Sequence, residues 1–195
     1  MTTQLHRTSP EISENPSHLS NEDIRRLLVI CDQDFNKQNL SDIVRILANT
    51  GLRVGELRDL CWSNVNFTKS LIQVVSRKTM YKRNVPVGPK TIQVFKARHI
   101  REPKSDFAFD EGRGGILSLA SRQFRIVAKQ LGVGPVSFHA LRRSFALRLA
   151  SPGVDPAVLS LILGYKMILP TRRSFLTLAQ KYACAVTVMA RLEEF

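Results

Sequence analysis

The spacing of apolar residues changes within this chain, and that change limits the possible folds more than any other feature. Over most of the sequence, apolar residues recur every three or four positions, which is typical of helices that pack on a core. Between Val65 and Val87 the chain is instead rich in β-branched residues and broken by turn-like segments, which indicates short strands. We therefore expect a mainly α domain with one small antiparallel β-sheet, an α+β fold. The expected strands are 65–67, 71–75 and 84–87.

Local signals indicate where the helices begin and end. Ser20 can cap a helix, and Asp23 three residues later completes a capping box. Gly51 follows a helical segment as a natural left-handed stop, and Pro89 suits the first turn of another helix. The expected helices are 20–31, 40–50, 54–60, 89–98, 119–131, 137–150, 155–163 and 177–193.

The domain organisation follows from where apolar residues are absent. Residues 1–18 are polar, contain Pro10 and Pro16, and are expected to form a flexible tail or the remnant of a linker. Residues 19–195 are enough for one domain with a sizeable core. The chain shows no apolar segment suited to a secretory signal or long enough to span a bilayer, so no membrane association is expected.

Cysteine usage gives a prediction about metal binding and compartment. The cysteines at positions 31, 61 and 184 lie far apart, without a CxxC pair or a Cys/His cluster at metal-ligand spacing. We interpret them as reduced, mostly buried thiols, and we expect a cytoplasmic protein without a bound metal.

The charge balance points to a polyanionic partner. Lysine and arginine number 29 against 16 aspartate and glutamate, which gives a net charge of +13. Such a surplus attracts nucleic acids, because neutralising their phosphates releases condensed counterions. The alternative is a basic surface that serves only solubility.

Two segments in the first half of the chain carry candidate functional residues. In Thr50–Leu57 (TGLRVGEL) a helix ends at glycine, Arg53 begins the next helix, and Glu56 lies nearly on the same face. Alone, this spacing also fits a surface ion pair. The basic segment Ser76–Arg83 (SRKTMYKR) lies between two predicted strands, where a hairpin lysine can contact DNA backbone. Alone, it fits a charged turn.

Two further segments lie in the second half. In Phe138–Arg143 (FHALRR) the apolar residues form the buried stripe of a helix, and His139 and Arg142 share an adjacent face, where both can reach one ligand. The plain alternative is a histidine at the edge of the core beside a solvated arginine. The fourth segment is Leu163-Gly164-Tyr165, followed by PTRRSF at 170–175, where a helix ends and a basic helix begins.

In this order and at this spacing, the four segments resemble the catalytic domain of the tyrosine recombinases, the phage integrase family. That family shows TGLRxxEL, a lysine in a β-hairpin, HxxR, LGH or LGW, and a tyrosine about ten residues later. The resemblance extends from about Leu19 to Leu178. It implies the family's fold, a duplex DNA partner, and strand cleavage and rejoining through a 3′-phosphotyrosine. It implies neither a cofactor nor a small-molecule substrate.

The resemblance also assigns roles to residues. Arg53 and Arg142 would grip the scissile phosphate, because guanidinium groups match its non-bridging oxygens in two-point geometry. Lys78 best fits the acid that protonates the departing 5′ oxygen, with Lys82 as its rival, and His139 would assist proton transfer. Glu56 would orient the Arg53 helix. The other basic residues expected to contact DNA are Arg77, Lys82, Arg143, Arg172 and Arg173.

Two positions depart from the family pattern. Tyr165 stands where the family has histidine or tryptophan, and its hydroxyl can still donate a hydrogen bond to phosphate. Phe175 stands where the family has its nucleophilic tyrosine. A phenyl ring has no oxygen, so it cannot form the covalent intermediate. Cleavage is therefore expected to be lost, and whether the chain acts as an enzyme stays open.

Three explanations fit Phe175: natural decay of an integrase, an engineered inactive variant, or a shift of register in this segment. Tyr182, expected on the following helix, is the other candidate nucleophile, although a packing role suits it better. Tyr165 is a weaker candidate because it directly follows the helix-ending glycine.

Two expectations concern the ends of the chain. Family members usually carry an N-terminal helical domain that completes a clamp around DNA, and here only a polar tail precedes Leu19. The segment 179–195 is apolar at helical spacing, and in the family such a helix often docks on a neighbouring protomer. It would allow homo-oligomers on DNA; the alternative is packing on its own domain. The apolar residues concerned are Ala183, Val186, Met189 or Ala190, and Leu192.

Three hypotheses about function therefore remain. The first is a DNA recombinase whose nucleophile is missing or lies at another position. The second is a catalytically silent relative that occupies recombination sites or partners an active recombinase. The third is an interaction protein whose basic face meets RNA or acidic proteins.

Overall fold

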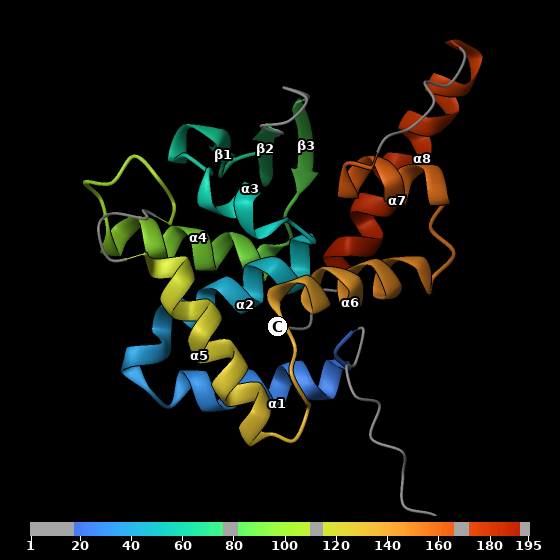
Figure 1. The fold of residues 1–195 in the computed structure, drawn as a ribbon. Helices are drawn as coiled ribbons and strands as arrows, with labels where there is room; N and C mark the ends of the chain where they lie inside the picture. Colours follow the sequence, from blue (N-terminus) through green and yellow to red (C-terminus); the bar gives the residue numbers. More distant parts are fainter. Residues whose placement is uncertain (1–17, 76–81, 110–114, 166–171, 192–195) are drawn as a thin grey trace, which may run out of the picture.

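The computed structural model describes residues 18–75, 82–109, 115–165 and 172–191, and for 172–180 it describes the backbone alone. Helix α2 (Gln38–Thr50) lies at the centre of the molecule and is buried along most of its length. Figure 1 shows it surrounded by the four helices that cover it. Those helices are α1 (Asn21–Asp32), α4 (Pro89–Arg101), α5 (Ile116–Gln130) and α6 (Phe138–Ala150).

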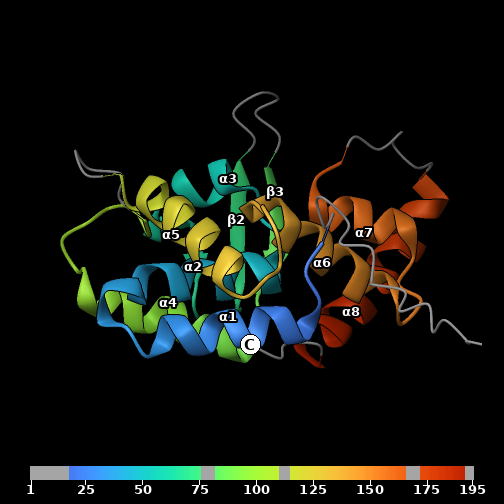
Figure 2. The ribbon, with the colours of Figure 1, turned by 60° about the horizontal axis from the view of Figure 1, so that its bottom comes forward.

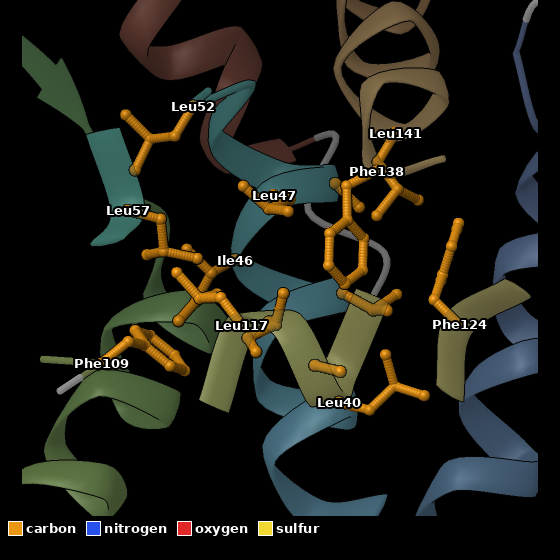
Figure 3. Packing of buried hydrophobic residues seen from close by; sticks show 14 of the residues in the cluster. Leu40, Ile46, Leu47, Leu52, Leu57, Phe109, Leu117, Phe124, Phe138 and Leu141 are labelled. Carbon is orange, nitrogen blue, oxygen red and sulfur yellow. The ribbon is translucent and has the colours of Figure 1, made fainter. Parts of the chain in front are cut away.

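The main hydrophobic core forms around this central helix. Leu40, Ile46 and Leu47 of α2 are fully buried, and aromatic rings from neighbouring elements pack beside them (Figure 3). Phe124 of α5 and Phe138 of α6 lie with their ring centroids 4.8 Å apart. The expected buried stripe of the α6 helix is confirmed, because Phe138, Leu141, Phe145 and Leu149 are all at most 4% exposed.

A three-stranded antiparallel sheet with the order β1-β2-β3 packs on this helical layer, as expected from the change in residue pattern. Its strands are β1 (Val65–Asn66), β2 (Leu71–Val75) and β3 (Lys82–Pro86). In β3 the side chains alternate, so that Arg83 and Val85 are buried while Lys82 and Asn84 are exposed. The third strand begins two residues earlier than predicted, which brings Arg83 inside the sheet.

A second hydrophobic cluster joins α6 to α7 (Pro156–Leu163) and α8 (Arg172–Arg191), on the right of Figure 2. The short α3 (Val54–Arg58) and two 3₁₀ turns, η1 (Phe35–Lys37) and η2 (Trp62–Asn64), complete the elements. The second cluster contains Phe145, Leu149, Val158, Ile162, Leu163, Ala185 and Met189.

The last helix differs from its prediction in two respects. It begins at Arg172, five residues before the expected start, so Phe175 and Tyr182 lie on one helix and not on two. Ala183 is exposed, whereas Ala185 and Met189 face the domain's own core. The described part of α8 therefore packs on its own domain, which was the alternative to docking on a neighbour.

The predicted helix signals are confirmed where they matter for the functional residues. Ser20 and Asp23 form a reciprocal capping box at the start of α1. Gly51 ends α2 with φ +63°, and a Cβ there would lie 2.4 Å from Phe145 Cδ1. Glycine is required at this position both for the left-handed backbone and for the close approach of α6.

A fully buried arginine, Arg98 of α4, holds the far side of the domain together. Its guanidinium lies 4.0 Å from the ring centroid of Phe109 and donates to Asn39 Oδ1 (2.6 Å) and Glu102 Oε1 (3.0 Å). This group contributes to packing away from the candidate functional residues.

The three cysteines are free, as expected, but only one of them is buried. Burial and the neighbouring carboxylate of Asp32 raise the pKa of Cys31 to about 12. Cys61 is half-buried and Cys184 is exposed, so the expectation of mostly buried thiols was wrong for these two. Among the helices of the described residues, none is both long and apolar enough to cross a membrane.

Candidate functional site

Three arginine side chains donate hydrogen bonds to consecutive backbone carbonyls at the C-terminal end of α7. Arg83 Nε donates to the carbonyl of Ile162 (2.9 Å), and Arg142 Nη2 donates to the carbonyl of Leu163 (2.6 Å). Arg53 Nη2 reaches the next carbonyl, that of Gly164, at 3.4 Å. The carbonyls at a helix C-terminus lack partners within the helix and carry partial negative charge, which favours cations there.

Arg142 is the most central of the three. It projects from α6, is only 2% exposed, and its second Nη donates to the carbonyl of Gly51. One guanidinium thus joins the ends of α2 and α7. Burial lowers the pKa of Arg142, and the positive charge of Arg53 lowers it further, while Glu56 and Tyr165 act in the opposite direction. An anion bound beside Arg142 would favour the charged guanidinium and so oppose both effects.

Arg53 is the more accessible guanidinium. It precedes α3 as its N-cap residue, and its side chain is 43% exposed. Its backbone N–H donates to Glu56 Oε2 (2.8 Å) and its Nη1 donates to Glu56 Oε1 (2.9 Å). The Glu56 side chain is 7% exposed, so this is not the surface ion pair that the spacing alone allowed.

Glu56 is shared with a second arginine, Arg83, which the sequence did not single out. Arg83 Nη1 and Nη2 donate to the two oxygens of Glu56 at 2.8 and 2.9 Å, and both side chains are buried. Burial by itself would raise the pKa of Glu56, but hydrogen bonds from Arg83 and Arg53 outweigh it and hold that pKa below its ordinary value. The signal that could have identified Arg83 is its alternation with Val85 in β3, which places both on the inner face.

His139 lies in the first turn of α6, one turn before Arg142. Its side chain is exposed, and its backbone N–H donates to the N-cap hydroxyl of Ser137 (3.3 Å). Partial burial lowers the pKa of His139, as do the charges of Arg143, Arg142 and Arg53. The imidazole therefore loses its proton at a lower pH than an ordinary histidine does, and it lies in the field of several cations.

Tyr165 packs against two of the arginines. Its ring centroid lies 5.2 Å from Arg142 Cζ and 5.9 Å from Arg53 Cζ, and the side chain is 52% exposed. Gly164 turns the chain at this point with φ +69°. The tyrosine therefore borders Arg53 and Arg142, and its contact with a phosphate stays a prediction.

The structure thus brings together four of the predicted residues, Arg53, His139, Arg142 and Tyr165. Arg143 is exposed on α6 beside His139. Lys82 begins β3 with its side chain on the face opposite to Arg83.

The other predicted residues lie where no side chain is described. Lys78 and Arg77 lie outside the described residues, and Arg172, Arg173 and Phe175 belong to the start of α8, of which only the backbone is described.

Tyr182, the other candidate nucleophile, is engaged in packing. Its hydroxyl donates to the carbonyl of Asn84 in β3 (2.7 Å), and its ring packs on the second hydrophobic cluster. Burial raises its pKa to about 12. It lies seven residues after Phe175, two turns further along one face of α8.

Together, Arg53, Arg142 and His139 can hold an anion with several oxygens. Two guanidinium groups and an imidazole offer N–H donors from α6 and from the residue that precedes α3, and fixed donors of this kind stabilise negative charge that develops during a reaction. Among the described residues, no three His, Cys, Asp or Glu side chains gather as metal ligands. That no cofactor is needed stays a prediction.

Comparison with known proteins gives one consistent result. A family model described as the phage integrase family matches residues 17–179. The chain is 28% identical over 171 residues to tyrosine recombinase XerA of Pyrococcus furiosus, covering 84% of this chain and 59% of that protein. It is 30% identical over 173 residues to XerA of Pyrococcus horikoshii, covering 84% and 58%.

Solved structures agree. The crystal structure of XerA recombinase matches with a TM-score of 0.67 and 26% identity over 85% of this chain and 65% of that one. The Tn1549 transposon integrase, in complex with transposon right end DNA, matches with a TM-score of 0.66 and 23% identity over 93% of this chain and 66% of that one. At that identity the likeness supports the fold alone. The chain spans 58–59% of the length of the XerA proteins it matches.

Proposed function

Because the chain belongs to the phage integrase family, the tyrosine recombinases, we propose that it binds duplex DNA and holds one backbone phosphate against Arg53, His139 and Arg142. The observation that carries this proposal is the meeting of Arg53 and Arg142 on the last carbonyls of α7, with His139 one helical turn away. The net charge of +13 supports a polyanionic partner.

The chemistry of phosphodiester cleavage explains why these side chains suit that role. Attack on the phosphorus atom increases the negative charge on the non-bridging oxygens, and cations fixed in advance stabilise that charge. Arg142 is held by two carbonyls and Arg53 by Glu56, so neither guanidinium has to reorganise as the charge develops. Neutral His139 can accept a proton or, once protonated, donate one.

The acid that protonates the leaving 5′ oxygen is proposed to be Lys78. Its rival, Lys82, projects to the face of the sheet opposite to Arg83, whereas Arg83 points toward Glu56. This alternation favours a lysine from the segment between β2 and β3 over the first residue of β3.

Covalent cleavage is proposed to be absent because Phe175 occupies the nucleophile position. Tyr182 does not replace it in this proposal, since its hydroxyl is bonded to the carbonyl of Asn84 and its pKa is about 12. The second candidate function follows from the same residue: a silent relative that occupies recombination sites or partners an active recombinase.

Binding is tested with the chain as it is. The wild type is titrated with duplex DNA over a series of salt concentrations, and its affinity should fall steeply as salt increases. Arg53→Gln should weaken binding and reduce the slope of log affinity against log salt by about one. Arg25→Gln, which changes an exposed arginine of α1, serves as the control and should leave the slope unchanged. Absence of binding at low salt would overturn both candidate functions.

Cleavage is tested by restoring the hydroxyl. Phe175→Tyr is incubated with a pool of duplexes of randomised sequence, each nicked so that the short fragment leaves after cleavage. If the site is otherwise intact, a covalent adduct on the strand that ends in the 3′-phosphate should appear on a denaturing gel. The wild type should give none. No adduct from Phe175→Tyr, together with normal binding, favours the silent relative.

The same gel tests the assignment of the nucleophile position. If the wild type forms an adduct and Tyr182→Phe abolishes it, Tyr182 is the nucleophile and the register that assigns Phe175 is wrong. If the wild type forms no adduct, and Phe175→Tyr still forms one when it is combined with Tyr182→Phe, the assignment of Phe175 to the nucleophile position stands.

Two expectations stay predictions. Homo-oligomers on DNA through the C-terminal helix would have to use a face of α8 other than the one bearing Ala185 and Met189, since these pack on the chain's own core. Sedimentation with and without duplex DNA tests this. The cytoplasmic location also stays a prediction from sequence.

A further inference from the structure

We propose that Arg83 is a positioning residue of the phosphate site: without touching DNA, it fixes the directions of Glu56 and of the turn at Gly164, and through them the guanidinium of Arg53. This inference rests on the proposed function, because it assigns a role within the same phosphate site.

Each of the three nitrogens of the Arg83 guanidinium donates a hydrogen bond to a partner within the site. Nη1 and Nη2 donate to the two oxygens of Glu56, and Nε donates to the carbonyl of Ile162. All three guanidinium nitrogens are thus bonded inside the protein, and only 3% of the side chain is exposed. Any influence of Arg83 on a bound phosphate must pass through the groups it holds.

Arg53 donates to the same carboxylate, that of Glu56. Glu56 Oε1 accepts from Nη1 of both arginines, and Oε2 accepts from Arg83 Nη2 and from the backbone N–H of Arg53. A planar guanidinium bound to both oxygens sets the plane of the carboxylate. The direction in which Oε1 faces Arg53 is therefore set from the buried side by Arg83.

Arg83 also contacts the turn at Gly164, the residue directly before Tyr165. Gly164 lies directly against the Arg83 guanidinium, since a Cβ at this position would be 2.7 Å from Nη1 and 2.8 Å from Cζ. The absence of a side chain at Gly164 is what admits Arg83 beneath the turn. Arg53 Nη2 reaches the carbonyl of the same Gly164 at 3.4 Å, so one turn contacts both a buried arginine and an exposed one.

Stability alone gives a weak reason for this arrangement. Bringing two charges into the interior costs desolvation free energy, and apolar side chains often stabilise a fold equally well at such positions. A buried pair with bidentate geometry defines one orientation, which an apolar pair would not do. The orientation of Arg53 is the property that requires it.

The test uses Arg83→Lys, which keeps the charge and loses the planar fork. Its matched control is Arg98→Lys, which changes an equally buried and hydrogen-bonded arginine on the far side of the domain. Gly164→Ala is the second variant, because it displaces the guanidinium while Arg83 is retained. It also keeps the test decisive if Arg83→Lys does not fold. All variants are measured at a temperature at which circular dichroism shows them folded.

Two readouts separate this inference from the proposed function. The first is the pKa of His139 in the DNA-free protein, measured by NMR, because the charge of Arg53 is one cause of its lowered value. Release of Arg53 should raise that pKa in Arg83→Lys and in Gly164→Ala, but not in Arg98→Lys. The second is adduct yield in the Phe175→Tyr background, which should fall by about tenfold or more in the same two variants.

Each possible result either supports or overturns the positioning role of Arg83. A raised pKa of His139 in Arg83→Lys, absent from Arg98→Lys, supports positioning even if Phe175→Tyr forms no adduct, in which case only the proposed function fails. An unchanged pKa of His139 in Arg83→Lys overturns the inference whatever the adduct yield. An equal change in Arg98→Lys overturns it as well, because the effect would then belong to general loosening of the fold.

Discussion

The guanidinium of Arg142 donates hydrogen bonds to the carbonyls of Gly51 and Leu163, the residues at which α2 and α7 end. Carbonyls at helix ends have no partner within their helix, and a buried acceptor without a partner is costly. One side chain therefore satisfies two helix ends and, at the same time, carries the charge proposed to meet the phosphate. Its structural role and its proposed role in binding phosphate therefore depend on the same group.

The first prediction follows from that double role. Arg142→Lys keeps a positive charge but has no planar fork, so it cannot serve both carbonyls. We expect the free energy of unfolding to fall by about 1–3 kcal/mol, measured by urea denaturation, and affinity for duplex DNA to fall as well. Arg143→Lys is the neighbouring control, because Arg143 is exposed, and it should change stability by less than about 0.5 kcal/mol. Equal stability of the two variants would refute the double role.

The second prediction concerns the close approach at Gly51. Gly51→Ala places a methyl group in a left-handed backbone, at about 1–2 kcal/mol, and 2.4 Å from Phe145 Cδ1, where overpacking adds about 1–3 kcal/mol. Gly153→Ala is a control for the backbone contribution, because Gly153 has φ +77° and its Cβ would meet nothing within 4 Å. Thermal melts should show the larger loss for Gly51→Ala. Equal losses would mean that α6 can move away from this residue freely.

The third prediction concerns acid stability. Because the folded-state pKa of Glu56 is lowered, its stabilising contribution is present above its ordinary pKa of 4.5 and is lost as pH falls through the lower folded value. Glu56→Gln leaves Arg83 buried without a counter-charge and should cost about 3–5 kcal/mol at pH 7. The difference from the wild type should shrink below pH 4.5. Denaturation at pH 7 and pH 4 measures it, and a difference that grows at low pH would contradict this account.

Glu22→Gln is the control for that comparison. Glu22 lies on the surface of α1, 3.6 Å from Arg25 Nη1, with 69% of its side chain exposed. Exposed ion pairs of this kind contribute little, so stability should change by less than about 0.5 kcal/mol at either pH.

The roles of Arg53, His139 and Arg142 came from the family resemblance, and local periodicity indicated only where these residues lie on the helices. His139 and Arg142 lie on one side of a helix whose buried stripe is readable from its spacing, and Arg53 follows a glycine that ends a helix. Each of these features depends on a few neighbouring residues. Tyr165 was singled out because it stands at the family's LGH or LGW position, directly after the glycine that ends α7.

The residues that the sequence missed depend on pairing between distant segments. Arg83 is buried because β3 pairs with β2 in a register that aligns Val74 with Arg83, and a basic run between strands does not reveal that register. The spacing of Arg53 and Glu56 likewise says nothing about the burial of Glu56 or about Arg83, which lies 27 residues further along the chain and binds both oxygens of its carboxylate. Tyr182 was assigned to a separate helix because nothing in the local pattern showed that α8 begins as early as Arg172.

The fourth prediction concerns the protonation of His139. In the DNA-free protein its pKa is below 6.5, owing to partial burial and to the charges of Arg143, Arg142 and Arg53. A phosphate held by these arginines brings negative charge beside the imidazole and should raise that pKa. Since the protonated form then binds more tightly, affinity for duplex DNA should increase as pH falls from about 8 to about 6. Titration of the His139 Cε1 proton by NMR, with and without duplex DNA at low salt, measures the shift directly.

Arg143→Gln should raise the pKa of His139 in the DNA-free protein because it removes a nearby cation, whereas Arg125→Gln on α5 should not. A pKa that stays the same when DNA binds would place the phosphate away from His139 and would remove the imidazole from the proposed site.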